Sequence, residues 1–322
     1  LTRWKQSHQP FHWWIEFYGI MKKGGFDVII GNPPYVEYRV VRNTYRIQAS
    51  QFKSESANNL YAFCMERSAR LVSSVGRFGM IVPAGLLGLD ETVDLRETLL
   101  LRFGMNWFST YAIRPSKLFD GVDQRLCIHL ASAYPSRARI FTTMYHHWYI
   151  EERPSLFTLL QYHASKVFPG LNRIPQIGNM EAAGLLTKLQ AMLGVPIKSY
   201  YASNRSGFLM HYHRSPRYWI RGMDFEQYFK SETRERSIHH FRDIYFRAET
   251  LGKSIGAILN SSLFFYWFIS IGNGRNITGS DVEQFPVGPL ADSTCRDLIS
   301  LFEKLMGDYK ANAVIRIRQD CE

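Results

Sequence analysis

Cysteine is scarce in this chain, and no two cysteines stand at the spacing of a metal site. The four are Cys64, Cys127, Cys295 and Cys321. They lie far apart and form no Cys-x-x-Cys pair, which argues against a zinc site and against a disulfide framework. We therefore expect no bound metal, and a protein of the reducing cytoplasm.

The chain also lacks a long uninterrupted hydrophobic run. Its longest apolar stretch, residues 255–271, contains Asn260, Ser261 and Ser262 near its start. A membrane helix needs about 18 to 20 clean apolar residues, so we predict a buried helix here and no membrane partner. No signal peptide is visible, and the chain opens at Leu1 without a methionine, which we interpret as the mark of a fragment.

Acidic residues are outnumbered by basic ones, 28 against 39, which gives a formal net charge of +11. Such an excess favours a polyanionic partner such as nucleic acid, although a merely basic protein has the same charge. Hydrophobic residues make up 46% of the chain and charged residues 21%, as in globular proteins, so a disordered chain is excluded. At about 100 to 200 residues per domain, this length predicts two domains.

Hydrophobic periodicity in the first half alternates between strand and helix. We predict strands at residues 26–30, 78–82, 107–113 and 126–133, and helices at residues 58–75 and 90–103. The first run is apolar apart from Asp27, which is typical of a strand buried on both faces of a parallel sheet. The last two strands follow each other directly, as in a hairpin. This order predicts an α/β sheet.

A change of composition after residue 150 marks the expected domain boundary. Three prolines, Pro154, Pro169 and Pro175, punctuate residues 150–178, so we assign residues 1–150 to the sheet domain and residues 151–322 to a second domain. Residues 201–222 contain no acidic residue but hold Arg205, Arg214, Arg217 and Arg221 among aromatic residues. This mixture is typical of a nucleic-acid-binding surface. For each arginine alone, a solvated surface residue is the alternative.

Three histidine pairs do not supply a metal site. They are His146 with His147, His211 with His213, and His239 with His240. No carboxylate or cysteine stands at ligand spacing from any pair, so we interpret them as surface or DNA-facing histidines. The sequence also shows neither the Pro-Asp…Asp/Glu-x-Lys pattern of nucleases nor the Gly-x-Ser-x-Gly elbow of hydrolases.

Directly after the first predicted strand, residues 32–35 read Asn-Pro-Pro-Tyr. Two consecutive prolines end a β-ladder, so this segment lies beyond the carboxyl end of the strand, where open α/β sheets bind ligands. The side-chain oxygen of Asn32 and the carbonyl of Pro33 suit the hydrogens of a nucleobase amine, and such acceptors direct the nitrogen lone pair at a methyl donor. Tyr35 supplies a stacking face for a base taken out of the duplex. A proline-rich turn without chemistry is the alternative.

Residues 11 to about 133 resemble the catalytic domain of N6-adenine-specific DNA methyltransferases, in particular the branch with fused type II restriction-modification enzymes and related phage-defence methylases. The likeness follows the family's order of motifs. Residues 11–17 and 25–35 resemble its lead-in and catalytic loop, residues 59–63 and 77–83 its next helix and strand, and residues 117–119 with 126–128 the region of its second base-stacking aromatic. These motifs cover about a third of the chain.

The resemblance implies a partial Rossmann-like sheet of an S-adenosylmethionine-dependent methyltransferase, followed by an α+β target-recognition domain. Its catalytic loop would be Asn32, Pro33, Pro34 and Tyr35, in which the Asn32 side chain and the Pro33 carbonyl bind the amine of a flipped adenine. Tyr35 and Phe119 would stack on that adenine.

The resemblance also implies that Phe63, or else Tyr61, lies against the adenine of the cofactor. For Phe119, Tyr61 and Phe63 alike, core packing is the alternative, because an aromatic at helical spacing is usually buried. The main cofactor motifs of the family precede its catalytic loop, and residues 1–25 contain no Gly-rich turn that could be the first of them. We therefore expect these motifs upstream of the chain.

In the second domain, residues 251–268 and 276–287 resemble the helix and the proline-tipped segment that close a target-recognition region. Arg275 then joins the arginines of residues 201–222 as a candidate contact to phosphates or base edges.

A sheet without three of its strands would expose an apolar edge beside residues 26–30. We expect double-stranded DNA as a partner, and a complementing N-terminal segment or subunit to cover that edge.

Two functional hypotheses follow. In the first, the chain belongs to a site-specific adenine N6 methyltransferase of a restriction-modification or phage-defence system, truncated at its N-terminus and by itself weakly active or inactive. In the second, it is a non-catalytic DNA-binding specificity module left from such an enzyme. Methylation of a protein amide or of RNA would share the loop, but it leaves the large basic second domain unexplained.

Overall fold

A computed structural model describes residues 11–44, 47, 51–134, 137–192, 194–216, 219–228, 230 and 241–314. The chain forms two compact units, Leu1–Met180 and Glu181–Glu322. The division therefore lies at residue 180 and not at residue 150. Residues 151–180 stay with the first unit because their backbone bonds to it: Arg96 Nε donates to the carbonyl of Asn172 at 2.8 Å, and the Ile174 amide donates to the carbonyl of Leu87 at 3.0 Å.

The first unit is built on a six-stranded mixed sheet of order β1-β2-β4-β3-β5-β6. Its strands are β1 (Phe26–Gly31), β2 (Val72–Pro83), β3 (Met105–Tyr111), β4 (Leu126–Ser132), β5 (Arg139–His146) and β6 (His163–Ser165). β1 pairs with β2, and β3 with β5, in parallel, whereas β4 runs antiparallel to both β2 and β3. The predicted α/β class and the antiparallel pairing of the last two predicted strands are confirmed.

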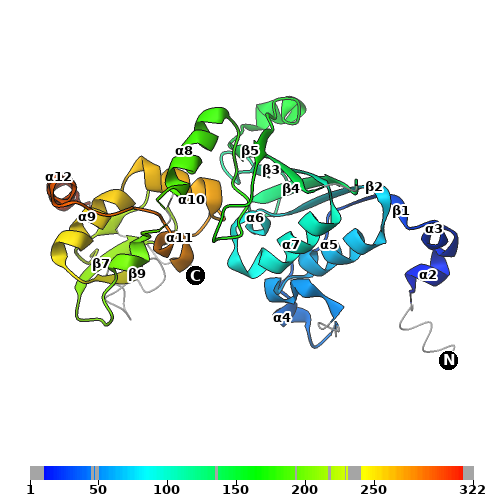
Figure 1. The fold of residues 1–322 in the computed structure, drawn as a ribbon, viewed down its shortest axis with the longest axis horizontal. Helices are drawn as coiled ribbons and strands as arrows, with labels where there is room; N and C mark the ends of the chain where they lie inside the picture. The colour runs from blue at the N-terminus through cyan, green and yellow to red at the C-terminus, as the bar shows by residue number, and fades with distance from the viewer. Residues whose placement is uncertain are drawn as a thin grey trace. The chain divides into compact units, whose positions relative to one another are not determined.

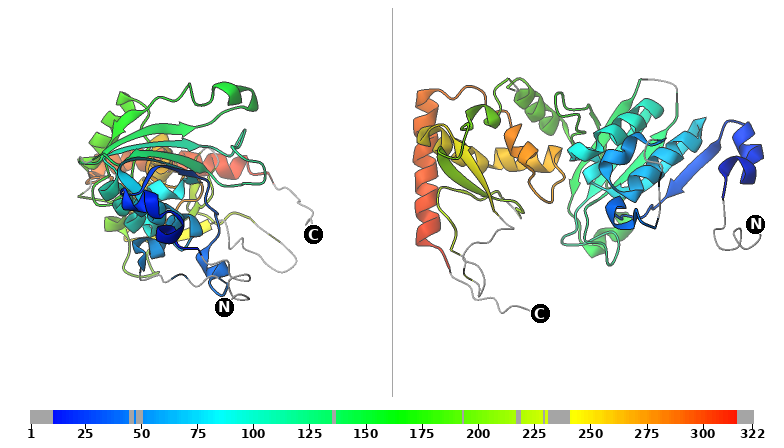
Figure 2. Two further views of the ribbon diagram at one scale, coloured as in Figure 1. Left: turned by 90° about the vertical axis from the view of Figure 1, so that its right-hand side faces the viewer. Right: turned by 90° about the horizontal axis from the view of Figure 1, so that it is seen from below.

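Helices α5 (Leu60–Leu71) and α7 (Val93–Arg102) lie side by side on one face of this sheet (Figures 1 and 2). The smaller elements are α2 (Trp13–Glu16), α3 (Tyr18–Lys22), α4 (Tyr38–Val41), η2 (Lys53–Ala57), α6 (Gly85–Gly88), η3 (Asp90–Thr92) and η4 (Ile150–Ser155). The helix predicted to reach residue 75 ends at Leu71. The strand β2 begins directly after it, because Val72 and Val75 flank two serines in a segment that favours extended backbone.

Strand β1 is an edge strand, and the prediction that it is buried on both faces is wrong. Ile29 packs into the core beneath α5 and α7, but Val28 is 60% exposed and Ile30 81% exposed. The strand register aligns Ile30 with Gly79, Leu130, Trp107 and Phe141 on successive strands, on the face opposite the helices. We call these five residues the apolar row.

The core under α5 and α7 contains one buried histidine. His129 on β4 is fully buried, with its ring stacked on Phe108 at 4.2 Å between centroids and its Nε2 3.0 Å from Asn106 Oδ1. Since the Asn106 amide nitrogen donates to the Phe103 carbonyl, its oxygen accepts and His129 carries its hydrogen on Nε2. Burial lowers the pKa of His129 to about 3, so the ring stays neutral in the folded protein.

The second unit has a three-stranded antiparallel sheet of order β8-β7-β9, made of β7 (Phe208–His213), β8 (Gly222–Met223) and β9 (Phe241–Phe246). Helix α12 (Asp292–Ala311) packs along α9 (Glu249–Leu259). The remaining elements are α8 (Met180–Gln190), η5 (Ile197–Tyr200), α10 (Ser262–Ile271) and α11 (Gly279–Glu283).

The apolar stretch predicted as one helix is divided between α9 and α10. The side chain of Ser261 accepts a hydrogen bond from the Phe264 amide and so begins α10, while Asn260 ends α9 and bonds to Gly222 of β8. No single helix in the described ranges is both long and apolar enough to cross a membrane. Among the described helices, α9 and α10 taken together reach that length and composition, and they meet at a 65° bend.

The burial of neutral His129 predicts a pH-dependent stability. Its folded pKa lies below the ordinary value of 6.5, so its contribution is complete above that pH and is lost as pH falls toward 3. We expect the first unit to lose about 2 kcal/mol of unfolding free energy between pH 7 and pH 5 from this residue. Urea unfolding of His129→Gln should show a shallower pH dependence of the unfolding free energy than the wild type. Equal dependence for wild type and His129→Gln would contradict the assignment.

Candidate functional site

The Asn-Pro-Pro-Tyr segment leaves the sheet at the carboxyl end of β1. The β1 ladder stops at Gly31, opposite Met80 of β2, because Pro33 and Pro34 have no amide hydrogen with which to extend it. Pro33 is buried, and Asn32 and Pro34 are exposed. The segment is thus anchored by Pro33 while the Asn32 side chain reaches solvent.

The hydroxyl of Tyr35 connects this segment to the next strand. It lies 2.6 Å from Asn32 Oδ1 and 2.8 Å from the carbonyl oxygen of Ile81 on β2. Burial of the ring, with a smaller effect of the Cys127 sulfur, raises the pKa of Tyr35 to about 12, so the phenol is a hydrogen-bond donor at neutral pH. The position and orientation of Asn32 are therefore tied to β2 through Tyr35.

A second hydrophobic cluster brings Phe119 to the same part of the unit. Its buried members are Tyr111, Leu118, Leu126, Trp148 and Leu156, and both Tyr35 and Phe119 pack against it half-buried. The two aromatics that the sequence assigns to base stacking thus border one cluster, although they are 84 residues apart in the chain. Their role as stacking residues stays a prediction.

The loop that carries Phe119 is held by η4. Arg153 donates from Nη2 to the carbonyl of Leu118 at 2.5 Å, and its guanidinium lies 5.5 Å from the centroid of the Trp148 ring. Lys117 and Asp123 close the loop with an exposed ion pair of 3.0 Å. Sequence reasoning missed both Arg153 and Ile81. The Ile81 contact uses a backbone carbonyl, which no side-chain pattern reveals, and Arg153 belongs to no motif.

The two candidate cofactor residues lie in the core. Tyr61 and Phe63 on α5 are each 4% exposed; Tyr61 joins the cluster under the sheet helices, and Phe63 packs edge-on against Tyr38 and Phe52. Burial raises the pKa of Tyr61. Core packing accounts for both positions, and contact with a cofactor stays a prediction. Neither ring offers an open face to a ligand within the described residues.

The candidate DNA-binding arginines occupy turns of the second unit. Arg205 and Arg275 are exposed, Arg214 and Arg221 are half-buried, and Arg217 lies outside the described residues. A hydrogen-bonded junction joins two of the segments: the Ile277 amide donates to the Arg214 carbonyl at 2.7 Å, and Ser215 Oγ donates to Asn276 Oδ1 at 2.6 Å. The structure therefore brings the Arg214 turn and the Arg275 loop together, which their spacing in the sequence does not show.

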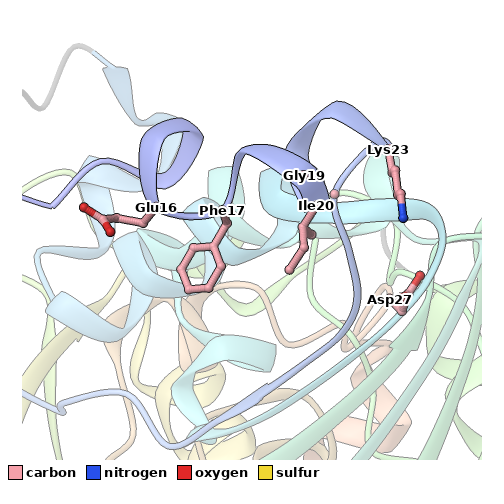
Figure 3. A pocket seen from close by; sticks show the side chains of 7 residues that line it. Glu16, Phe17, Gly19, Ile20, Lys23 and Asp27 are labelled. Atoms are coloured by element: carbon pink, nitrogen blue, oxygen red, sulfur yellow. The ribbon is translucent and has the colours of Figure 1, made fainter.

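A separate hollow of about 390 Å³ lies at the other end of β1. Figure 3 shows its labelled side chains on the helical lead-in, from Glu16, Phe17 and Ile20 to Lys23, with Asp27 facing them from the strand. Asp27 and Asn32 are five residues apart, which is about 16 Å along a strand. This hollow is not part of the Asn32 site.

Side chains that could bind a metal ion are dispersed over the described part of the chain. Within the described ranges, no three His, Cys, Asp or Glu residues gather as a metal site would require. His211 instead bonds through Nδ1 to Asp243 Oδ1 at 2.8 Å across β7 and β9. The pair His239 and His240 lies outside the described residues.

Comparison with known proteins gives one matching family model. Residues 2–111 match the model described as Eco57I restriction-modification methylase. A curated protein of Methanocaldococcus jannaschii named "Putative type II restriction enzyme and methyltransferase" is 26% identical over 137 residues, which cover 42% of this chain and 11% of that protein. The chain thus spans about a tenth of the length of the curated relative it matches. Both matches support a relation to restriction-modification methylases.

Solved structures give more distant likenesses. The type IIL restriction-modification enzyme MmeI, in complex with DNA, has a TM-score of 0.47 at 12% identity over 93% of this chain and 51% of that chain. A nuclease-deletion mutant of the type ISP enzyme LlaGI, with a DNA substrate mimic, has a TM-score of 0.41 at 11% identity over 62% of this chain and 18% of that chain. At these TM-scores the likeness carries no functional argument.

The contacts of Arg153 predict a local effect on the Phe119 loop. Arg153→Ala removes the donor to Leu118, so we expect faster amide hydrogen exchange across residues 117–122 and a loss of about 1 kcal/mol in unfolding free energy. Glu151→Ala, at an exposed position of the same short helix, is the matched control and should leave the loop's exchange unchanged. Unaltered exchange in Arg153→Ala would show that η4 does not hold the loop.

Proposed function

We propose that the chain is part of a site-specific DNA methyltransferase that transfers a methyl group from S-adenosylmethionine to the N6 amine of a flipped adenine in duplex DNA. The observation that carries this proposal is the Asn32–Tyr35 segment itself. It stands at the carboxyl end of a sheet strand, with Asn32 exposed and with its amide oxygen positioned by Tyr35. The match of residues 2–111 to a restriction-modification methylase model supports it.

In this proposal the protein acts by positioning acceptors. The adenine amine is a weak nucleophile because its lone pair is delocalised into the ring. Asn32 Oδ1 and the Pro33 carbonyl accept its two hydrogens and so favour a tetrahedral nitrogen with the lone pair directed outward. Tyr35 and Phe119 hold the base by stacking. The required groups are neutral and preorganised, and no covalent intermediate with the protein is needed.

S-adenosylmethionine is the methyl donor that such chemistry uses, and a methylase family implies it in general. The residues of this chain proposed to contact it do not form an open site, because Tyr61 and Phe63 are buried. We therefore place its main binding motifs in a complementing segment or subunit, and we assign this chain the base-holding half of the reaction.

The surface of the first unit supports such a complement. Ile30, Leu130, Trp107 and Phe141 of the apolar row lie on a face that the sheet helices do not cover, and Ile30 and Leu130 are 81% and 44% exposed. Contiguous apolar surface that reaches an edge strand, as β1 is among the described strands, is typical of a protein-binding surface. Arg77 and Arg139 stand exposed on the adjoining strands, so a covering helix with acidic flanks would fit.

The alternative function is a DNA-binding specificity module without catalysis. Burial of Tyr61 and Phe63 favours it, because neither side chain is more than 4% exposed to a cofactor in the described structure. Both hypotheses share duplex DNA as partner and the second unit as the region that binds it. They differ in what Asn32 does.

Substitution of Asn32 separates the two functions. With the complementing segment supplied, Asn32→Ala should lower methyl transfer to mixed-sequence duplex at least about 100-fold, as loss of one preorganised group does in other enzymes, while duplex affinity stays within twofold. Labelled S-adenosylmethionine and nucleoside analysis of the product measure both the rate and the base. Exposed Asn43→Ala is a control outside the site. Unchanged transfer in Asn32→Ala, or a methylated base other than adenine, would refute this function.

Phosphate contacts by the second unit predict a steep salt dependence of duplex binding. The logarithm of the association constant should fall linearly with the logarithm of salt concentration, and Arg205→Gln or Arg275→Gln should each reduce the slope by about 1. Arg139→Gln, at an exposed arginine of the first unit, should leave the slope unchanged. Fluorescence anisotropy of a labelled duplex gives the association constant, and salt concentrations between about 50 and 200 mM are wide enough to measure its slope. An association constant that does not change with salt concentration would contradict DNA as the partner.

A further inference from the structure

The Tyr35 hydroxyl has one hydrogen and two acceptors within reach. Asn32 Oδ1 lies at 2.6 Å and the Ile81 carbonyl oxygen at 2.8 Å, both at good hydrogen-bond distance. A phenol donates one hydrogen bond at a time, so only one of the two oxygens accepts the hydroxyl hydrogen at any moment. The other oxygen keeps its lone pairs for a different donor.

The Ile81 carbonyl is available because of the way the sheet ends. β1 and β2 pair in register as far as Gly31 and Met80, and Ile81 is the next residue of β2. The chain turns away at the two prolines, and Tyr35 then returns to β2 with its hydroxyl against that carbonyl. The ring is half-buried against both hydrophobic clusters, which fixes the hydroxyl between the two acceptors.

We propose that the Tyr35 hydroxyl is a positioning group that orients the Asn32 side chain, and that its hydrogen passes from Asn32 Oδ1 to the Ile81 carbonyl when a base amine reaches Asn32. This role is additional to stacking by the ring, and it rests on the proposed function of Asn32. No covalent bond changes. A hydrogen bond to Asn32 is exchanged for one to Ile81, and the amine of the base replaces the phenol as donor to Oδ1.

The exchange has a physical advantage for amine recognition. A free asparagine side chain at an exposed position would rotate and present Nδ2 as often as Oδ1. While the phenol donates to Asn32, its partner must be Oδ1, because Nδ2 has no free lone pair, so this bond selects the orientation in which Oδ1 points at the hydroxyl. Because a second acceptor stands at 2.8 Å, release of Oδ1 leaves no buried donor unpaired, so the base does not have to overcome that cost.

The first test measures the Asn32 side chain directly, without DNA or cofactor. In the full chain labelled with ¹⁵N-asparagine, the side-chain amide resonances of Asn32 are identified by their loss in Asn32→Ala. We expect Tyr35→Phe to shift them upfield in nitrogen and to speed rotation of the amide group, since the hydrogen bond to Oδ1 is gone. Tyr38→Phe removes a hydroxyl that bonds to Ile47 instead, and it should leave them unchanged. Unchanged resonances in Tyr35→Phe would overturn the proposal.

The second test separates the hydroxyl from the ring in catalysis. With the complementing segment supplied, Tyr35→Phe should lower kcat for methyl transfer about tenfold, as expected for one neutral hydrogen bond, with KM for duplex within twofold. Tyr35→Ala removes the ring as well and should also raise KM. A Tyr35→Phe enzyme with wild-type kcat would overturn the positioning role.

The two tests distinguish this proposal from the proposed function. If the wild-type chain transfers no methyl group even with the complementing segment supplied, the methyltransferase assignment fails, while the Asn32 resonances still decide whether Tyr35 orients the amide. If transfer proceeds and depends on Asn32 but neither resonances nor kcat respond to Tyr35→Phe, the function stands and the positioning role fails.

Discussion

The absence of amide hydrogens at Pro33 and Pro34 determines the arrangement of the candidate site. Because neither residue can donate to β2, the β1 ladder ends at Gly31 and the chain leaves the sheet plane. This ending leaves the next carbonyl of β2, at Ile81, without a donor from β1, and the Tyr35 hydroxyl lies within hydrogen-bond distance of that carbonyl. A side chain thus replaces the backbone donor that a longer strand would have supplied, and the same side chain fixes Asn32.

The two hydrophobic clusters give this arrangement its rigidity. One fills the space between the sheet and the helices α5 and α7; the other lies under the loops that follow β3 and β5. Tyr35 packs against both, so the candidate site stands where the two clusters meet at the end of the sheet. Phe119 and Arg153 belong to the second cluster and its surroundings, and they bring loop residues to the site without lengthening any strand.

The main strands and helices of the first unit and the end of β1 could be predicted from the sequence. β-branched and apolar runs predict the strands, helical spacing predicts α5 and α7, and Asn-Pro-Pro-Tyr marks the end of β1. The exposure of Val28 and Ile30 could not be predicted, because a run of apolar residues has the same composition whether or not its outer face is covered. The helix break at Ser261 depends on one capping hydroxyl, and the Ile81 contact depends on a backbone atom. The pairing of the Arg214 and Arg275 segments depends on tertiary hydrogen bonds alone.

The apolar row has a consequence for how much of this protein a cell would keep. Exposed apolar surface of this kind is an aggregation liability, and because chaperones and proteases remove unfolded protein, a stability difference of about 1 to 2 kcal/mol changes abundance several-fold. Copies whose row is covered would persist, and uncovered copies would be removed. A polypeptide that covered Ile30, Leu130 and their neighbours would therefore raise the amount of this chain that persists.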